Sequence, residues 1–300
     1  KLKSKAIAAL YIARTDISNV CRQSALKVWK GLTANTTELA MDNMTEIVYE
    51  MTSQIGSESE DIQFIVARAL NDTISKLGDS VLPMVLPEMT AGLSPDNDET
   101  TREGLCMGLA EVFNALSKKQ YQEYEDILLP CLERAICDPS EKVRTQAASA
   151  FSKLTKVAGL QPAEKVVSTL VKKIATSSLL SVASGGAQST ESEAATSLRG
   201  LKEILQARPR DVLDFLIPIA VQSPMTLRNS LLLETACAAA GETISHYMAK
   251  ILHTVVGEMK ILSKQVEEEE AGGAASGTSG DRDAIRDALE KSVQHTMAAL

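Results

Sequence analysis

Residues 138–144 of the chain read DPSEKVR, and this stretch decides the fold because its pattern recurs. In it, Asp138 stands six residues before Arg144. The same pairing of an aspartate with an arginine six residues later occurs in DNDETTR at 96–102 and in DISNVCR at 16–22. Apolar residues follow each arginine at the same three offsets, three, seven and ten residues downstream. The chain is therefore expected to repeat one structural unit.

The spacing of the arginines gives the length of this repeat. Arg22, Arg102, Arg144 and Arg228 are separated by 80, 42 and 84 residues, close to two, one and two multiples of about 40. Self-similarity at this period is typical of HEAT and armadillo-like solenoids, which stack pairs of helices into extended scaffolds. We therefore expect an all-α fold, an α–α superhelix in which each repeat is a helix A, a short turn and a helix B.

The pattern predicts the order of the repeats along the chain. The expected repeats are 1–34, 37–78, 79–117, 121–159, 163–208 and 211–245, followed by a further helix at 246–266. Helix A of the second repeat is expected at 38–54, and Gln63 takes the arginine position there. In the fifth repeat, an insertion of roughly five residues around 184–189 is expected to bring Glu191 into that position. The acidic and Gly/Ser-rich residues 267–281 predict a disordered linker, and 282–300 predict one more repeat helix.

Three prolines recur at the same place in the repeat. Pro87, Pro130 and Pro218 lie 43 and 88 residues apart, again one and two periods. A proline inside a helix removes a hydrogen bond, so its recurrence predicts a tolerated kink in helix A.

The Asp–Arg pairs allow a structural and a functional interpretation. Aspartate is a preferred N-cap, so it can satisfy free N–H groups of helix B while the arginine projects from the first turn of that helix. Stacking would then align these residues as a ladder in which each aspartate also reaches the arginine of a neighbouring repeat. The predicted ladder consists of Asp16, Arg22, Asp96, Arg102, Asp138, Arg144 and Arg228. Alternatively, the arginines line a groove for an acidic partner. We favour the ladder because three of the arginines have their own aspartate, and this leaves the partner-binding residues unknown.

The residue pattern points to no catalytic, cofactor or metal site. The three histidines, His246, His253 and His295, have neither a third ligand at metal-site spacing nor a nucleophile–base arrangement. The glycine-rich stretch 272–280 lacks the Gly-Lys-Ser/Thr ending of a phosphate loop. The chain is therefore expected to bind other proteins and not to be an enzyme.

Composition restricts the compartment and the class of partner. The net charge of −8 argues against a nucleic-acid groove, since phosphate binding needs clustered Lys and Arg. No apolar run approaches the ~18 residues of a membrane span, and the start has no signal-peptide layout. Because the first residue is Lys1, we expect a piece of a longer protein. Four cysteines in apolar helical stretches predict buried thiols and a reducing compartment such as the cytosol. They are Cys21, Cys106, Cys131 and Cys237.

Several phrases, in order along residues 10–255, resemble one family. The most specific is CRQSALKVWK at 21–30, followed by ANT at 34–36. The others are KLG at 76–78 with VLP at 81–83, REGLCMGLAEV at 102–112, AICDP at 135–139 with EKVR at 141–144, and LRGLKEIL at 198–205. Together they resemble the general control non-derepressible translational activators. These are giant HEAT scaffolds that activate the kinase of the α subunit of translation initiation factor 2.

The resemblance implies a function that the residues alone do not. It implies a cytoplasmic scaffold segment, associated with the ribosome and supporting that kinase during amino-acid starvation. The implied partners are the kinase, the ribosome and other proteins, without a membrane or direct sequence-specific contact to nucleic acid. An alternative is another HEAT adaptor, such as a nuclear transport receptor or a phosphatase scaffold subunit. A tubulin-binding array is disfavoured because such arrays use Trp in turns, whereas Trp29 aligns with Phe151 and is expected in the core.

Overall fold

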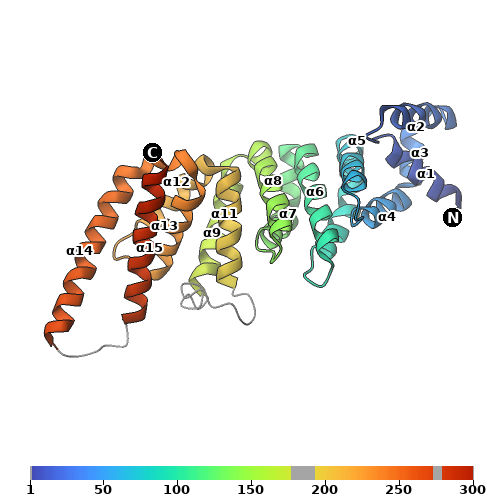
Figure 1. The fold of residues 1–300 in the computed structure, drawn as a ribbon. Coiled ribbons are helices and arrows are strands. Elements are labelled where there is room, and N and C mark those ends of the chain that lie inside the picture. Colours follow the sequence, from blue (N-terminus) through green and yellow to red (C-terminus); the bar gives the residue numbers. More distant parts are fainter. Residues whose placement is uncertain (1, 177–192, 273–278, 300) are drawn as a thin grey trace. The chain divides into compact units, whose positions relative to one another are not determined.

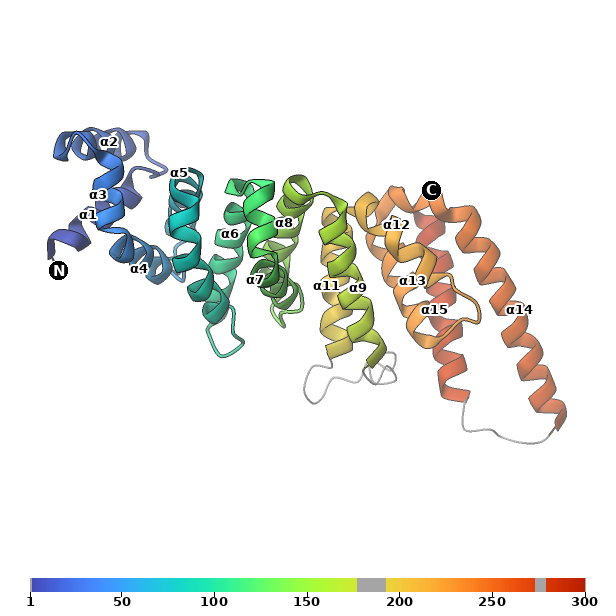
Figure 2. The ribbon, with the colours of Figure 1, turned by 180° about the vertical axis from the view of Figure 1, so that it is seen from behind.

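The computed structural model describes residues 2–176, 193–272 and 279–299. It confirms the all-α solenoid, built from helices that group into two compact bodies (Figures 1 and 2). The N-terminal body is Lys1–Gly159 and the C-terminal body is Leu160–Leu300.

The N-terminal body stacks successive helix pairs. Its helices are α1 (Leu2–Ala13), α2 (Asn19–Leu32), α3 (Thr36–Asp42), α4 (Met44–Gln54), α5 (Glu60–Gly92), α6 (Glu99–Ala115), α7 (Lys118–Ile136) and α8 (Glu141–Ala158). Helix α5 contains a non-helical residue, Leu77 (φ −134°, ψ 20°), which divides it into two parts. The first part of α5 and α8 both belong to the helix-B layer, with α6 packed against α5 on one side and α8 on the other. Gly159 ends α8 with a φ of 85°, the left-handed conformation that glycine adopts at low cost.

The repeated apolar positions form the core between stacked helices. In α6 and α8 the residues three, seven and ten positions after the arginine are all buried: Leu105, Leu109 and Val112, then Ala147, Phe151 and Leu154. Each buried aliphatic or aromatic side chain contributes about 1.5–3 kcal/mol relative to an exposed one. The three recurring prolines lie inside helices A of their repeats, in α5, α7 and α12.

The C-terminal body continues the same construction. It contains α9 (Leu160–Thr176), α11 (Glu193–Ala207), α12 (Pro209–Ala220), α13 (Leu227–Ala239), a short 3₁₀ helix η1 (Gly241–Tyr247), α14 (Met248–Gly272) and α15 (Ser279–Ala298). Helix α11 packs against α9, and α15 packs against α13.

Several expected boundaries differ from the structure. Helix A of the second repeat is not one helix over 38–54, because α3 ends at Asp42 and α4 begins at Met44. The Asn43 side chain donates to the carbonyl of Leu39 at 2.8 Å and satisfies one of the last acceptors of α3. The helix expected at 246–266 begins at Met248 instead.

The expected linker at 267–281 is the largest difference. Helix α14 continues to Gly272, so the run Glu267–Glu270 lies within a helix, and α15 already begins at Ser279. Residues 273–278 lie outside the described residues, as do the predicted insertion at 184–189 and Glu191.

Candidate functional site

The turns that carry the Asp–Arg pairs are capped differently from our expectation. The N-cap of helix B is the residue two positions after the aspartate: Ser18 in α2, Asp98 in α6 and Ser140 in α8. Asp16 and Asp138 each accept the backbone N–H of that capping serine, at 2.7 and 2.8 Å. The aspartate therefore orients the cap instead of being the cap. Ser and Asp are preferred N-caps, so the sequence carried this signal.

Each arginine of the repeated pattern holds its own turn through backbone carbonyls. Arg22 Nη1 donates to the carbonyl of Asp16 at 2.6 Å, and Arg144 Nη1 donates to the carbonyl of Asp138 at 2.9 Å. Arg102 Nη1 donates to the carbonyl of Asn97 in the same way. Because turn carbonyls need partners when they are buried, these bonds keep the tight link between helix A and helix B folded.

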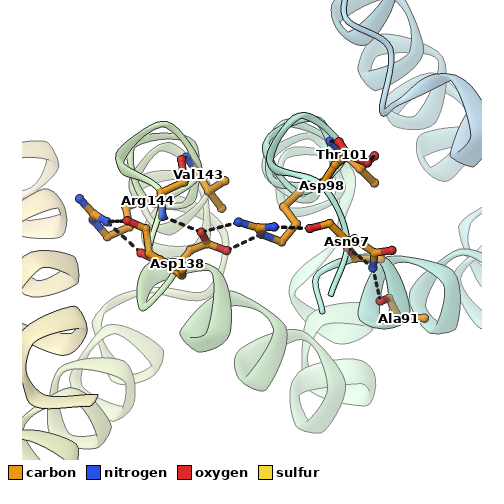
Figure 3. Close-up of polar contacts among 11 residues, drawn as sticks. Ala91, Asn97, Asp98, Thr101, Asp138, Val143 and Arg144 are labelled. Carbon is orange, nitrogen blue, oxygen red and sulfur yellow. Dashed lines mark hydrogen bonds and ion pairs between the residues drawn. The ribbon is translucent and has the colours of Figure 1, made fainter. Parts of the chain in front are cut away.

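One arginine also joins two consecutive repeats. Arg102 Nε and Nη2 donate to the two carboxylate oxygens of Asp138 at 2.7 and 3.1 Å, a bidentate contact from α6 to the turn before α8 (Figure 3). The two side chains are only 9% and 5% exposed. The hydrogen bonds that Arg102 donates to the Asp138 carboxylate raise the pKa of Arg102 above its ordinary value, so the guanidinium stays charged. Such paired, planar contacts fix distance and orientation together.

The joint one repeat earlier uses an uncharged amide. Gln63, 3% exposed, occupies the arginine position in the second repeat. Its Nε2 donates to the carbonyl of Ser57, six residues earlier, at 3.0 Å, and to the carbonyl of Thr100 in the third repeat at 3.3 Å. Gln63 thus performs both tasks of Arg102, with hydrogen bonds that carry no net charge.

The remaining residues of the predicted ladder lie differently. Asp96 is exposed and accepts the Ser94 hydroxyl at 3.0 Å. Arg228 donates to Asn229 Oδ1 at 3.1 Å, and Asn229, 2% exposed, is the residue that bonds back to the turn through the carbonyl of Gln222. In the sixth repeat the role has moved by one position, so the choice of Arg228 was wrong.

Arg144 is buried, with 6% of its surface exposed. Its Nε, the atom by which Arg102 reaches Asp138, has no hydrogen-bond partner among the described residues. A ladder through every repeat therefore stays a prediction.

Trp29 and the cysteines test the predicted core. Trp29 is buried, as expected, and meets Tyr11 edge to face with ring centroids 5.2 Å apart. Cys106, Cys131 and Cys237 are buried free thiols. Cys21 is exposed, contrary to the prediction, because α2 buries only the side of Ala25 and Trp29.

In the parts of the chain that the structure covers, no group of three or more His, Cys, Asp or Glu side chains could hold a metal ion. Among those same residues, no helix combines the length and apolar character needed to cross a bilayer. What the site does is join repeats, which is the task of a scaffold.

Comparison with known proteins agrees with this architecture. The HEAT repeat family matches residues 128–158, which hold the end of α7, the Asp138 turn and α8. The chain is 30% identical to the eIF-2-alpha kinase activator GCN1 of Dictyostelium discoideum over 83% of its length. It is 29% identical to the stalled ribosome sensor GCN1 of Homo sapiens over 86%, and 23% identical to the eIF-2-alpha kinase activator GCN1 of Saccharomyces cerevisiae over 85%. The chain belongs to the GCN1 family. It spans about 9% of the length of each of these GCN1 proteins.

Proposed function

We propose that the chain is a non-enzymatic scaffold section of a cytoplasmic, ribosome-associated translational activator. In this role it supports activation of the kinase of the initiation factor 2 α subunit when amino acids are scarce or ribosomes stall. The observation that carries the proposal is the similarity over more than four-fifths of the chain to proteins named for these two roles. The buried contacts between repeats support it, since they suit a part whose task is to hold a fixed geometry.

A scaffold section of this kind acts by keeping the partners bound along the solenoid at a fixed separation. A solenoid whose repeats slip against each other cannot hold a kinase and a ribosome at a fixed separation. The bidentate Arg102–Asp138 contact fixes one such joint inside the N-terminal body. Loosening it should therefore reduce kinase activation while changing little of the exposed surface, because the two side chains are only 9% and 5% exposed.

The test uses the complete protein in its own cells. A tagged full-length protein is recovered after amino-acid starvation, and ribosomes and the kinase are measured in the recovered material. Phosphorylation of the initiation factor 2 α subunit is followed in cells whose only copy is wild type, Arg102→Met, or the control Arg286→Met at an exposed ion pair. We expect recovery of both partners, and reduced phosphorylation with Arg102→Met alone. Absence of both ribosomes and the kinase from the wild-type material would refute the proposal.

A further inference from the structure

A polar pocket lies in the N-terminal body where three repeats meet. It has a volume of about 370 Å³ and is lined by the turn after α1, the first part of α5, and α6. The residues that shape it are Arg14, Arg68, Asn71, Asp72, Glu111 and Asn114. None of them takes part in the Arg102–Asp138 joint, so the pocket is a separate feature of the helix-B side.

Two of its charged residues are fully occupied by the fold. Arg14 donates to the carbonyl of Tyr11 at 3.1 Å and to Asp72 at 3.3 Å, and its guanidinium lies 3.7 Å from the Tyr11 ring centroid. Asp72 also pairs with Lys76 at 2.7 Å. These groups form a fixed wall, because each charge is already neutralised.

The other two charged residues are not neutralised. Arg68, on α5, makes no hydrogen bond or ion pair with any residue that the structure describes, and its guanidinium lies 5.6 Å from the ring centroid of Phe64. Glu111, on α6, accepts only amide hydrogens, from Asn71 at 2.8 Å and from Asn114 at 3.4 Å. A cation and an anion therefore face the same pocket from neighbouring helices without meeting each other.

The pocket also offers groups that suit an extended backbone. A side-chain amide can bond both the N–H and the C=O of a main chain, and Asn114, which among the described residues makes only the 3.4 Å donation to Glu111, places such an amide beside the charges. An extended chain has such groups free, whereas a helix uses them internally. Phe64, 46% exposed, supplies an apolar surface next to Arg68.

We propose that this pocket binds an extended segment of a partner protein that carries one acidic and one basic side chain within four positions of each other. The acidic side chain binds Arg68 and the basic side chain binds Glu111. A phosphate group fits less well, because the unneutralised carboxylate of Glu111 repels a second negative charge. The two charges on different helices also fix the direction of the bound segment. This inference is independent of the proposed role in kinase activation.

The preferred direction of the bound peptide, from its acidic to its basic side chain, gives the sharpest test of the proposal. The probes are fluorescent heptapeptides in a Ser/Thr/Val background. Each contains one Glu and one Lys with zero to three residues between them, and both orders of the two charges are made. Binding to the full chain is measured by fluorescence anisotropy at low and physiological salt. We expect one order to bind better than the other, and better than peptides with a single charge. Arg68→Met and Glu111→Gln should each weaken binding about tenfold, the usual effect of losing one charge-assisted bond.

The charge-swapped variant Arg68→Glu/Glu111→Arg completes the test. It should restore binding with the opposite preferred order of Glu and Lys. The matched control swaps the exposed pair Arg286 and Asp283 in α15 and should change nothing. Far-ultraviolet circular dichroism confirms that each variant is folded. An unchanged order preference in the pocket swap, or no advantage of doubly over singly charged peptides, would overturn the proposal.

Discussion

Separating Arg102 from Asp138 should show how strongly two repeats are joined. Replacing Arg102 with Met leaves the Asp138 carboxylate, which is 5% exposed, with the Ser140 N–H as its remaining hydrogen-bond donor among the described residues. Removing one partner of a buried ion pair costs about 3–5 kcal/mol, because the remaining charge stays buried without compensation. We therefore expect Arg102→Met to destabilise the N-terminal body by about 3–4 kcal/mol. Asp138→Asn keeps the shape of the side chain and one acceptor oxygen, so we expect it to destabilise the N-terminal body by about 2–3 kcal/mol.

The double variant distinguishes a direct contact from two independent effects. If the pair acts as one unit, Arg102→Met/Asp138→Asn should cost little more than the worse single variant. The coupling energy from the double-mutant cycle would then be about 2 kcal/mol. The exposed pair Arg286 and Asp283 serves as the control, and its coupling energy should be less than about 0.5 kcal/mol.

The assay must report on the joint itself. Trp29 is the chain's one tryptophan and lies in α2, so its fluorescence is insensitive to a local opening between α6 and α8. Urea unfolding followed by circular dichroism gives the decrease in the free energy of unfolding of the whole body. Hydrogen exchange of backbone amides in α6 and α8 gives the free energy of local opening. Single-variant losses that simply add in the double variant would refute the view that this contact joins the repeats.

Three further predictions concern packing, reactivity and pH. A Cβ at Gly104 would clash with the carbonyl oxygen of Ile55, the C-cap of α4, so Gly104→Ala should lower the free energy of urea unfolding by at least about 3 kcal/mol. Gly31→Ala, with open space around it, should be neutral or slightly stabilising. In the native chain a thiol reagent should modify exposed Cys21 within minutes, while Cys237, whose pKa burial raises to about 11, should react only on unfolding; equal rates would contradict the structure. The pKa of Asp98 lies below its ordinary value because the hydroxyl and the N–H of the threonine three residues later donate to its carboxylate. The ionised carboxylate therefore stabilises the fold fully above pH 3.8, and this stabilisation is lost as the pH falls further. The melting temperature should accordingly fall less steeply with decreasing pH in Asp98→Asn than in the wild type.

The repeat architecture could be predicted because it depends on spacing. The residues three, seven and ten positions after Arg102 and Arg144 are buried as the pattern requires. Trp29 is also buried, as its alignment with Phe151 indicated. Periodic apolar positions determine which face of a helix packs, so this part of the fold follows from sequence.

The details of the turns could not be predicted in the same way. Asp138 and Ser140 are both good N-caps, and only the backbone path decides which of them caps α8. In the sixth repeat Asn229, not Arg228, bonds back to the turn, because a shift of one residue along a helix changes the direction of a side chain by about 100°. The unpaired charges of Arg68 and Glu111 also carried no sequence signal. They come from different repeats, 43 positions apart, and meet only when the helices stack.

The exchange of an arginine for Gln63 has a mechanical consequence. At the arginine position, the third and fourth repeats are linked by two charge-assisted hydrogen bonds, and the second and third by one neutral bond of 3.3 Å, beside which Asn71 donates to Glu111 at 2.8 Å. Charge-assisted bonds are roughly twice as strong as neutral ones. Under a pulling or bending force the contact at Gln63 should therefore open more easily than the contact at Arg102. The stack then behaves as a spring whose segments differ in stiffness, and the side chain at the arginine position contributes to that difference.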